Sequence, residues 1–363
     1  MKVLHLINNL GSGGAEKLLE DLIPLMNKME NVEADILLLT DKNNVFYYSL
    51  VNKGIKVDIV KYKNMYDPRN IFEIQKHIIK GHYDFVHAHT FPTQYWVALS
   101  RLVLNNKKVK FITTEHSTHN RRREKFYFRL IDKLIYSQYD SIISISEKTR
   151  DYLINWIDPK HKKLEKHVII ENGVDIEKIK EATPYKKSFL IDGIDEDTKL
   201  VCMVGRFSEA KDQPTLIKAI SKLADDVNLI LVGEGPLMDN NKELVNQLGI
   251  SNRVHFLGFR QDVFRILKTV DIVVLSSHWE GFGLGAVEGM AAGKPVIVSD
   301  VGGLSEIVKE AGFVFKNEKE LKNILNSLLT DHVLYKKTAE KCNCKAEKFD
   351  IKKMLTTLRN IYF

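Results

Sequence analysis

The sequence has few cysteines. Its 363 residues include only three, Cys202, Cys342 and Cys344. Three cysteines cannot build a disulfide framework for a chain of this length, and Cys342 and Cys344 lack the further ligands that a zinc site needs. These absences argue against a disulfide-stabilised secreted protein, and we expect a reduced, cytoplasmic compartment.

Long apolar segments are also absent. The first apolar run, Lys2–Ile7, is interrupted by Asn8 and Asn9 before it reaches the length of a signal-peptide core. No other segment approaches the length of a membrane span. We therefore expect a protein that is neither secreted nor integral to a membrane. The chain length and a hydrophobic content of 44% predict two ordinary domains with well-formed cores.

An excess of one charge sign occurs only in the first half of the chain. Residues 1–180 hold 29 Lys and Arg against 22 Asp and Glu, whereas residues 181–363 hold 25 of each sign. A basic half suits nucleic acid, an anionic membrane surface or a phosphorylated acceptor. No motif of a nucleic-acid-binding module is present, so we expect no nucleic-acid partner.

Short apolar runs alternate with amphipathic segments along the whole chain, which predicts an α/β fold with parallel sheets. The strands expected in the first half are Lys2–Ile7, Ala34–Leu39, Val57–Val60, Phe85–His89, Val109–Thr114, Ser141–Ser146 and Val168–Glu171. Those expected in the second half are Leu200–Val204, Asn228–Val232, Val254–Leu257, Ile272–Leu275, Val296–Ser299 and Phe313–Phe315. The helices expected between them include Ala15–Met26, Ile71–Ile79, Tyr95–Leu104, Lys125–Tyr136, Glu147–Trp156 and Glu318–Leu329.

This alternation of strands and helices predicts two Rossmann-like domains. We expect the first at residues 1–180 and the second at residues 190–344, with the C-terminal helix at about 345–363 packed back on the first domain. The polar stretch Pro184–Thr198 has no sustained period and is predicted to be the linker. The ligand is expected in a cleft between the carboxyl ends of the two sheets.

The most informative stretch is Asp271–Asp300, where an apolar strand, a glycine turn and a helical segment follow one another. In this turn the amides of Phe282, Gly283 and Leu284 are expected at the positive end of the helix, where an anion binds. This corner suits a diphosphate, and it lies between two carboxylates, Glu280 and Glu288.

With these residues in view, the chain resembles the retaining, GT-B-fold glycosyltransferases of family 4. Glu280 and Glu288 match the Glu-x7-Glu element of that family, and Arg206 and Lys211 match its Arg-x4-Lys element. Further matches are Gly11–Gly14, His116, Asn172–Asp175, Gly233–Pro236, Leu257–Gly258, and Gly302 and Gly303 with Glu306. The resemblance implies two Rossmann-like domains that face each other across a cleft. It also implies a nucleotide-sugar donor and a glycan or lipid-linked acceptor, in the biosynthesis of a bacterial-type surface polysaccharide.

The resemblance gives the matching residues expected roles. Arg206 and Lys211 would neutralise the leaving diphosphate in place of a metal ion, because fixed positive charge stabilises charge that develops during transfer. Glu288 would accept hydrogen bonds from the ribose hydroxyls, and Glu280 would contact the transferred sugar. Isolated Arg, Lys and Glu side chains are usually just solvated, so these roles depend on the combined match.

Residues of the first domain complete the candidate site. Gly13 and Gly14 follow the first strand and are expected to cradle phosphate or to admit the acceptor. His116 ends a strand and resembles the histidine near the donor sugar, although a lone histidine at a strand end is more often structural. In the VHAHT segment we expect His89 to face the cleft and His87 the opposite face, which excludes a metal pair. Gly258 is expected to lie near the nucleotide base.

The helix expected at Lys125–Tyr136, together with the arginines just before it, is basic and aromatic. In this segment Arg121, Arg122, Arg123, Lys125 and Arg129 alternate with aromatic and aliphatic side chains. Such a helix could rest on an anionic membrane or hold a lipid diphosphate, making the protein peripheral on the inner face of the cytoplasmic membrane. The simpler interpretation is a packed helix with solvated charges.

Other functions remain open at this level. The alternatives are a nucleotide-sugar epimerase, an NAD-dependent oxidoreductase and a non-catalytic glycan- or nucleotide-binding module. The spacing of Gly11–Gly14 departs from the dinucleotide fingerprint because Glu16 occupies the position of its last glycine. Asp195–Asp197 offers an Asp-x-Asp metal signature, but no apolar strand precedes it, and we expect neither a metal nor another cofactor.

Overall fold

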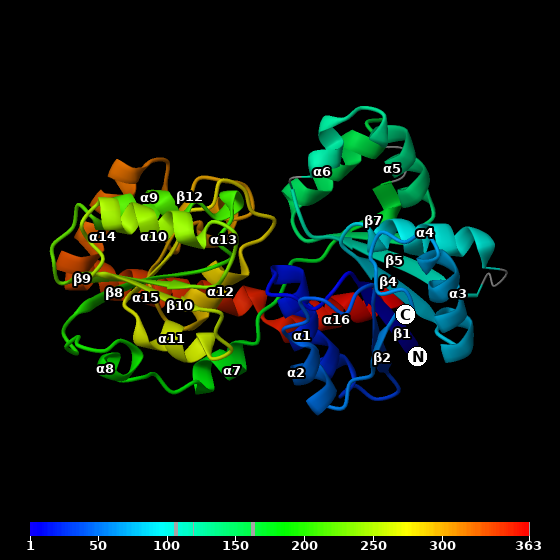
Figure 1. The fold of residues 1–363 in the computed structure, drawn as a ribbon, viewed down its shortest axis with the longest axis horizontal. Coiled ribbons are helices and arrows are strands. Elements are labelled where there is room, and N and C mark those ends of the chain that lie inside the picture. Colours follow the sequence, from blue (N-terminus) through cyan, green and yellow to red (C-terminus); the bar gives the residue numbers. More distant parts are fainter. Residues whose placement is uncertain (105–107, 119, 161–163, 363) are drawn as a thin grey trace. The chain divides into compact units, whose positions relative to one another are not determined.

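The computed structural model describes residues 1–104, 108–118, 120–160 and 164–362. The chain divides into unit 1, Met1–Asn172 with Met354–Phe363, and unit 2, Gly173–Lys353. Each unit contains one sheet in which all paired strands are parallel, covered by helices on both faces (Figure 1). The predicted α/β fold class with two Rossmann-like domains is confirmed.

The sheet of unit 1 has the strand order β3-β2-β1-β4-β5-β6-β7. From the neighbouring strands β1 and β4, successive strands of the chain are added outward in opposite directions, β2 and β3 beside β1, and β5, β6 and β7 beside β4. The topological switch point, where sheets of this kind bind ligands, therefore lies at the carboxyl ends of β1 and β4. The strands are β1 (Lys2–Ile7), β2 (Glu33–Leu38), β3 (Val57–Ile59), β4 (Phe85–His89), β5 (Lys110–Glu115), β6 (Ser141–Ser144) and β7 (His167–Ile169).

Helices cover both faces of this sheet. The helices of unit 1 are α1 (Gly14–Met26), α2 (Tyr47–Asn52), α3 (Asn70–Gly81), α4 (Thr93–Val103), α5 (Phe128–Ser137), α6 (Glu147–Ile157) and α16 (Ile351–Tyr362), with 3₁₀ turns at Arg121–Glu124 and Leu164–Lys166. Helices α3 to α6 share one apolar core with alternate residues of the strands. The C-terminal helix α16 belongs to this unit, because the Tyr362 hydroxyl bonds His87 Nδ1 at 2.7 Å and its ring lies 5.1 Å from that of Phe85.

The sheet of unit 2 has the order β10-β9-β8-β11-β12-β13, so its switch point lies at the carboxyl ends of β8 and β11. The strands are β8 (Lys199–Val204), β9 (Val227–Val232), β10 (Val254–Gly258), β11 (Ile272–Leu275), β12 (Val296–Ser299) and β13 (Phe313–Phe315). The helices are α7 (Ile176–Glu181), α8 (Lys187–Leu190), α9 (Gln213–Ile220), α10 (Met238–Gln247), α11 (Val263–Thr269), α12 (Leu284–Ala291), α13 (Ser305–Val308), α14 (Glu318–Thr330) and α15 (His332–Ala346), with 3₁₀ turns at Glu209–Lys211 and Glu347–Phe349.

Helix α12 packs unusually closely on the sheet of unit 2. A Cβ atom on Gly289 would lie 2.9 Å from Cβ of Val273 in β11. A larger residue at position 289 would push the helix away from the strand, because such a contact has no room for another atom. This glycine therefore sets the distance between α12 and β11, and with it the position of the neighbouring Glu288.

The stretch predicted as the linker, Pro184–Thr198, packs against unit 2. The Tyr185 hydroxyl donates to Asp262, and Lys187 Nζ lies 3.0 Å from Asp271 Oδ2. The chain passes between the units at Asn172–Gly173 and at Lys353–Met354 instead.

The two crossing segments lie side by side. Val174 N donates to Phe349 O at 2.9 Å, and Ile351 N donates to Val174 O at 2.9 Å. A Cβ atom on Gly173 would lie 2.4 Å from Ile351 Cα, so the crossing requires glycine at this position. This contact gives the Asn172–Asp175 motif a structural role.

Candidate active site

The switch point of unit 2 brings together two residues predicted for the donor site. Lys211 follows β8, Glu280 follows β11, and the Lys211 ammonium forms an ion pair with the Glu280 carboxylate. Their side chains are 22% and 18% exposed, so a ligand can still reach both. The residues are 69 positions apart in sequence and meet because β8 and β11 are neighbours in the sheet.

Hydrogen bonds fix the Lys211 loop over the end of β11. Ser276 Oγ donates to Asp212 O at 2.7 Å and to Lys211 O at 3.2 Å, and His278 N donates to Ala210 O at 2.9 Å. The loop after β8 therefore cannot move independently of the loop after β11. This connection keeps the ammonium of Lys211 beside the glycine turn.

Arg206 lies in the preceding loop, and its side chain is exposed. The Gly233–Pro236 segment packs directly against this loop. A Cβ on Gly233 would lie 2.2 Å from Gly205 O, and a Cβ on Gly235 would lie 2.3 Å from Phe207 O. Both glycines are thus required by backbone packing, which presents Arg206 at the carboxyl end of β8.

The glycine turn adopts the strand, turn and helix arrangement predicted for it. Phe282 is buried, Gly283 has a positive φ of 95° and caps α12, and Leu284 is the first residue of that helix. The loop after β12 packs tightly against the turn, because a Cβ on Gly303 would lie 2.7 Å from Glu280 O. The backbone amides at the helix start are thereby held in place beside Glu280.

Glu288 and Gly258 belong to two further elements of unit 2, α12 and β10. Glu288 lies in α12 and is only 7% exposed. A carboxylate buried to this extent needs polar partners, and Glu288 is not without interactions in the structure. Gly258 ends β10 with a φ of 63°, and its carbonyl accepts a hydrogen bond from Gly233 N at 2.8 Å.

The switch point of unit 1 carries the predicted N-terminal glycines. Gly13 caps α1, and Gly14 is the first residue of that helix. Asn8, at the end of β1, accepts a hydrogen bond from Thr93 Oγ1 at 2.7 Å and donates one to Phe91 O at 2.7 Å. The loops after β1 and β4 are therefore linked, as are the corresponding loops of unit 2.

Four histidines gather in unit 1, and one prediction about them was wrong. His87 and His89 lie on the same face of β4, with ring centroids 4.3 Å apart, because residues two apart on a strand point to the same side of the sheet. His5 of β1 bonds His89, and His89 bonds His116. Among the described residues, ligand nitrogens of His5, His87 and His89 lie within 4.8 Å of one another, a spacing compatible with a metal ion.

Burial makes these histidines poor bases. It lowers the pKa of His5 from 6.5 to about 3 and that of His116 to about 4. The pKa values of His87 and His89 also fall well below 6.5, first because of burial and then because of the neighbouring histidines. All four rings are therefore neutral at pH 7.

The prediction of the basic helix was wrong in two respects: the helix starts later than expected, and two of the arginines before it are not solvated. Residues Arg121–Glu124 form a 3₁₀ turn, and α5 begins only at Phe128. The Arg122 guanidinium is buried 4.0 Å from the ring centre of Phe91 and 3.6 Å from Asp132, while Arg123 lies 3.3 Å from Glu115. The side chain of Arg121 lies outside the described residues.

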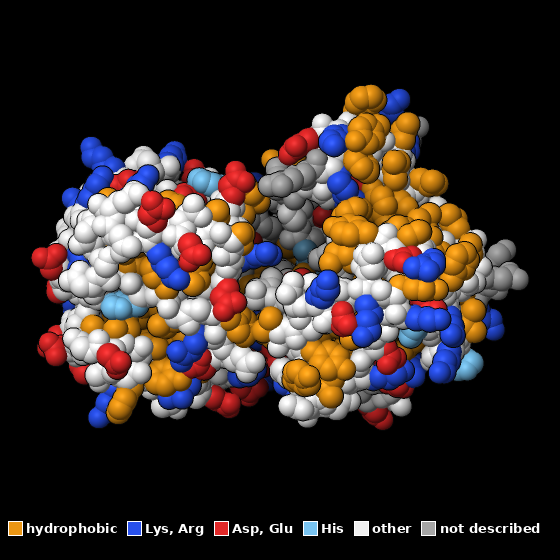
Figure 2. All heavy atoms as spheres, viewed as in Figure 1, with side chains coloured by type: hydrophobic (Ala, Val, Ile, Leu, Met, Phe, Trp, Pro, Cys, Tyr) orange, Lys and Arg blue, Asp and Glu red, His pale blue; other side chains and the backbone are white. Residues whose placement is uncertain are grey.

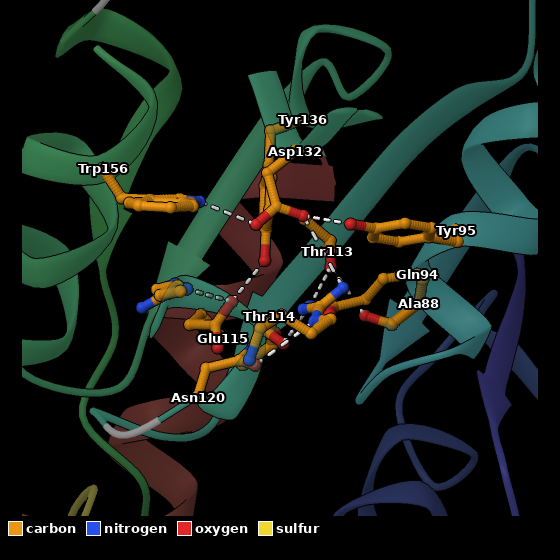
Figure 3. A network of polar contacts seen from close by, with 12 residues as sticks. Ala88, Gln94, Tyr95, Thr113, Thr114, Glu115, Asn120, Asp132, Tyr136 and Trp156 are labelled. Carbon is orange, nitrogen blue, oxygen red and sulfur yellow. Dashed lines mark hydrogen bonds and ion pairs between the residues drawn. The ribbon is translucent and has the colours of Figure 1, made fainter. Parts of the chain in front are cut away.

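The sequence reasoning missed the acidic network beneath this turn. Asp132 accepts hydrogen bonds from the Tyr95 hydroxyl and from Trp156 Nε1, and Glu115 accepts one from the Tyr136 hydroxyl (Figure 3). A signal was present, because Asp132 precedes the buried Tyr136 by four residues and so lies on the inner face of α5.

The outer face of α5 is apolar and basic. Figure 2 shows apolar side chains gathered over the part of unit 1 that carries α4, α5 and α6. Helix α5 contains one acid, Asp132, which is buried. The exposed residues on and just before this helix include Lys125, Phe126, Tyr127, Arg129, Leu130, Ile131, Lys133 and Leu134. None of the helices in the described ranges is both long and apolar enough to cross a membrane.

Two family profiles match the chain. The profile described as "Glycosyltransferase Family 4" matches residues 12–178, and that described as "Glycosyl transferases group 1" matches residues 185–349. The uncharacterized glycosyltransferase MJ1607 of Methanocaldococcus jannaschii is 30% identical over 243 residues, which are 62% of this chain and 60% of that protein.

Two further relatives align over nearly their whole length. One, from Campylobacter jejuni, is named N-acetylgalactosamine-N,N'-diacetylbacillosaminyl-diphospho-undecaprenol 4-alpha-N-acetylgalactosaminyltransferase. It is 25% identical over 360 residues, which are 95% of this chain and 94% of that protein. The crystal structure of Anabaena Alr3699/HepE in complex with UDP and glucose is 26% identical with a TM-score of 0.85, and covers 99% of both chains. Together with the fold, these matches assign the chain to the family 4 glycosyltransferases with the GT-B fold.

Proposed function

We propose that this glycosyltransferase moves a hexose or N-acetylhexosamine from a nucleotide-diphosphate sugar to a glycan or lipid-linked acceptor, with retention of configuration. The acceptor belongs to the biosynthesis of a bacterial-type surface polysaccharide. The observation that carries the proposal is the meeting of Lys211, Glu280 and the glycine turn at the switch point of unit 2. Support for the donor comes from HepE, a relative solved with UDP and glucose.

In the proposed reaction, the bond between the anomeric carbon and the diphosphate breaks, and the acceptor oxygen forms a new bond to that carbon. The acceptor proton passes to the leaving phosphate oxygen on the same face of the sugar. The leaving group develops negative charge, and fixed cations and amides stabilise it best. Lys211, Arg206 and the amides at the start of α12 supply this field, so the step requires no metal ion.

The ion pair of Lys211 with Glu280 places side by side the two groups that contact the diphosphate and the sugar of the donor. Glu280 fixes the direction of the ammonium while the donor is away. In the donor complex the Lys211 ammonium contacts a phosphate oxygen, and the Glu280 carboxylate contacts sugar hydroxyls. Glu288 holds the ribose, because a carboxylate accepts from two adjacent hydroxyls.

The test compares two lysines that each pair with a carboxylate beside β11. Lys211→Met removes the cation at the carboxyl end of the strand, and we expect the transfer rate to fall about 10²- to 10³-fold. Lys187→Met breaks the pair with Asp271 at the amino end, where the two atoms lie 3.0 Å apart. This control is expected to lower stability and to leave transfer intact.

Glu288→Gln provides the second arm of the test. The amide keeps the size of the side chain but loses one acceptor, so we expect the KM for the donor to rise roughly tenfold. Release of nucleoside diphosphate from UDP-, GDP- and ADP-sugars with lipid-linked acceptors measures both effects. Near-normal transfer by both Lys211→Met and Glu288→Gln would contradict the proposed site.

We also propose that the outer face of α5 holds unit 1 against an anionic membrane, on the cytoplasmic side where nucleotide sugars are available. The face combines apolar side chains with Arg129 and Lys133 and exposes no acid from α5, while the segment just before the helix exposes Glu124 and Lys125, and this composition of the helix suits anionic lipid headgroups. The Campylobacter relative, whose name specifies an undecaprenol-linked acceptor, supports this placement.

Leu130 and Val333 offer a matched comparison, since each is 76% exposed. Leu130→Asp in α5 is expected to reduce sedimentation with phosphatidylglycerol-containing vesicles, whereas Val333→Asp in α15 is expected to leave it unchanged. Pure phosphatidylcholine vesicles should bind more weakly than anionic ones, and added salt should reduce the difference between the two vesicle types. Equal sedimentation of the two variants would exclude α5 as the membrane contact.

A further inference from the structure

Two neighbouring arginines in unit 1, Arg122 and Arg123, lack acceptors for most of their hydrogen-bond donors. Their side chains are only 10% and 11% exposed. Among the described residues, Nη1 and Nη2 of Arg122 and all three side-chain nitrogens of Arg123 are buried without a hydrogen-bond partner. Every other described side chain with such an atom has only one. Since buried donors normally have acceptors, this concentration in one place needs an explanation.

The carboxylates paired with these arginines do not supply the acceptors. Arg122 Nη1 lies 3.6 Å from Asp132 Oδ1, and Arg123 Nη2 lies 3.3 Å from Glu115 Oε2, but neither contact is a hydrogen bond. Neutral donors bond the carboxylates instead, namely Tyr95 and Trp156 on Asp132, and Tyr136 on Glu115 (Figure 3). The two acids therefore balance the charge of the arginines, and the guanidinium N–H groups still need oxygen acceptors.

Aromatic rings hold the Arg122 guanidinium without satisfying its donors. Its Cζ atom lies 4.0 Å from the ring centre of Phe91 and 4.8 Å from that of Tyr95. Such contacts attract the positive charge, but they offer no lone pair to the N–H groups, which lie in the plane of the guanidinium. Only Nε has a conventional acceptor, Asn120 Oδ1 at 3.2 Å. The rings therefore fix the position of the group and leave its outer edge open to a ligand.

The arginines lie at the edge of the sheet where ligands bind. Glu115, the partner of Arg123, is the last residue of β5, and β5 is the neighbour of β4 in the sheet. This is the carboxyl edge, which also carries the switch point of unit 1. The turn that contains the arginines leads directly into the exposed Phe126 and Tyr127 and into α5. Unsatisfied cationic donors and an exposed apolar surface are thus adjacent along the chain.

We propose that Arg122 and Arg123 bind the phosphate of a lipid whose chain lies on the outer face of α5. Phosphate is the acceptor that fits, because its oxygens accept several hydrogen bonds at once from planar guanidinium groups. The inference rests on the proposed function, which supplies a lipid-linked acceptor as one source of this phosphate; an anionic phospholipid headgroup is the other. The covering turn has only four residues, so a small shift of this turn exposes the donors.

Substitutions of Glu115 distinguish a binding site from a structural ion pair. Glu115→Gln keeps the size of the side chain and an acceptor for Tyr136 but removes the charge that competes with phosphate, so phosphate affinity should rise severalfold. Arg123→Gln combined with Glu115→Gln removes both charges and leaves neither of them buried alone, and affinity should fall at least about tenfold. Arg101→Gln is the control, because Arg101 already bonds Asp140 at 2.9 and 3.0 Å, and it should leave affinity unchanged.

Tryptophan signals report this site and the donor site separately. The chain has three tryptophans. Trp156 Nε1 donates to Asp132 Oδ2 at 2.8 Å, whereas Trp279 directly precedes Glu280. The measurement is ¹⁵N NMR of the tryptophan-labelled full chain, with Trp156→Phe to assign the signal.

The titrants are farnesyl diphosphate, inorganic pyrophosphate, short-chain phosphatidylglycerol and, as the uncharged control, farnesol. We expect farnesyl diphosphate to shift the Trp156 indole signal and farnesol to leave it unchanged. Pyrophosphate should bind more weakly than farnesyl diphosphate, because it gains no apolar contact with the face of α5. Melting curves of each variant show whether it is folded, and Glu115→Gln alone still tests the proposal if the double variant does not fold.

A Trp156 shift that is strongest with farnesyl diphosphate supports a lipid diphosphate as the ligand, and one that is strongest with phosphatidylglycerol supports a phospholipid headgroup at the same site. No shift of Trp156 with any titrant, a shift confined to Trp279, or unchanged affinity in Glu115→Gln would overturn the inference and leave the arginines as a structural network. The proposed function fails separately, through near-normal transfer by Lys211→Met and Glu288→Gln. If those variants lose transfer and Trp156 does not respond, only the phosphate site is refuted.

Discussion

Gly303 offers a direct way to move the donor site without changing any side chain proposed to touch the ligand. It has a φ of 90°, and a Cβ at this position would lie 2.7 Å from Glu280 O and 2.9 Å from Gly281 O. Both neighbours are backbone atoms that cannot rotate away. In Gly303→Ala the backbone of the glycine turn must therefore shift by several tenths of an ångström.

Gly293 is a matched control in the same unit. Its φ of 75° imposes a similar conformational cost on alanine, but no atom lies within 4 Å of its Cβ position. We expect Gly293→Ala to destabilise unit 2 by about 1–2 kcal/mol, from the left-handed conformation alone. Gly303→Ala adds steric overlap and is expected to cost about 2–4 kcal/mol in total.

The decisive difference lies in binding. Displacing Glu280 and the start of α12 by less than 1 Å is expected to weaken nucleotide-sugar affinity roughly tenfold in Gly303→Ala, because positioned groups lose much of their effect when misplaced. Gly293→Ala should bind normally. Isothermal titration with the preferred sugar nucleotide, together with melting curves of both variants, measures the two effects. Equal affinities would refute the reasoning that Gly303 sets the geometry of the turn.

Two further predictions concern pH and thiols. Since burial lowers the pKa of His5 from 6.5 to about 3, the unfolded chain binds more protons below pH 6.5, and stability should fall as the pH drops through this range. At pH 5 the loss from this one residue is about 2 kcal/mol, and urea unfolding at pH 7 and pH 5 checks it; equal stability at the two pH values would contradict a buried neutral His5. Burial also raises the pKa of Cys202 to about 12 and that of Cys342 to about 11, whereas Cys344 is exposed. A thiol reagent should therefore modify Cys344 first in the native protein, and equally fast modification of all three would contradict this burial.

The strands could be predicted well because fully buried parallel strands appear as uninterrupted apolar runs. The structure has β1, β4, β11, β12 and β13 at the predicted residues. Local patterns also found the glycine turn and the start of α12. Short helices such as α8 and α13 were missed, because four residues do not establish a helical period.

Contacts between distant residues could not be predicted in the same way. Nothing near Lys211 in the sequence indicates its partner Glu280, and His5 lies inside an apolar strand, 84 residues from His89. Arg122 was expected to be exposed because runs of cations usually are, yet aromatic rings and Asp132 surround it. These partners are set by strand order and helix packing, which the pattern of a single segment does not contain.

The glycines near the switch point of unit 2 have two different explanations. Gly233, Gly235 and Gly303 are required by the protein itself, because a Cβ on each would overlap a neighbouring backbone oxygen. Gly258 is different, since the nearest atom to its Cβ position is a side-chain oxygen of Glu234 at 3.7 Å. Packing therefore does not explain Gly258, and its φ of 63° and its place at the end of β10 favour close approach of a ligand. Of these four glycines, Gly258 is thus the one whose substitution adds no overlap with a backbone atom to the conformational cost of a positive φ, so a loss of nucleotide affinity in Gly258→Ala beyond that of Gly293→Ala would indicate a ligand contact.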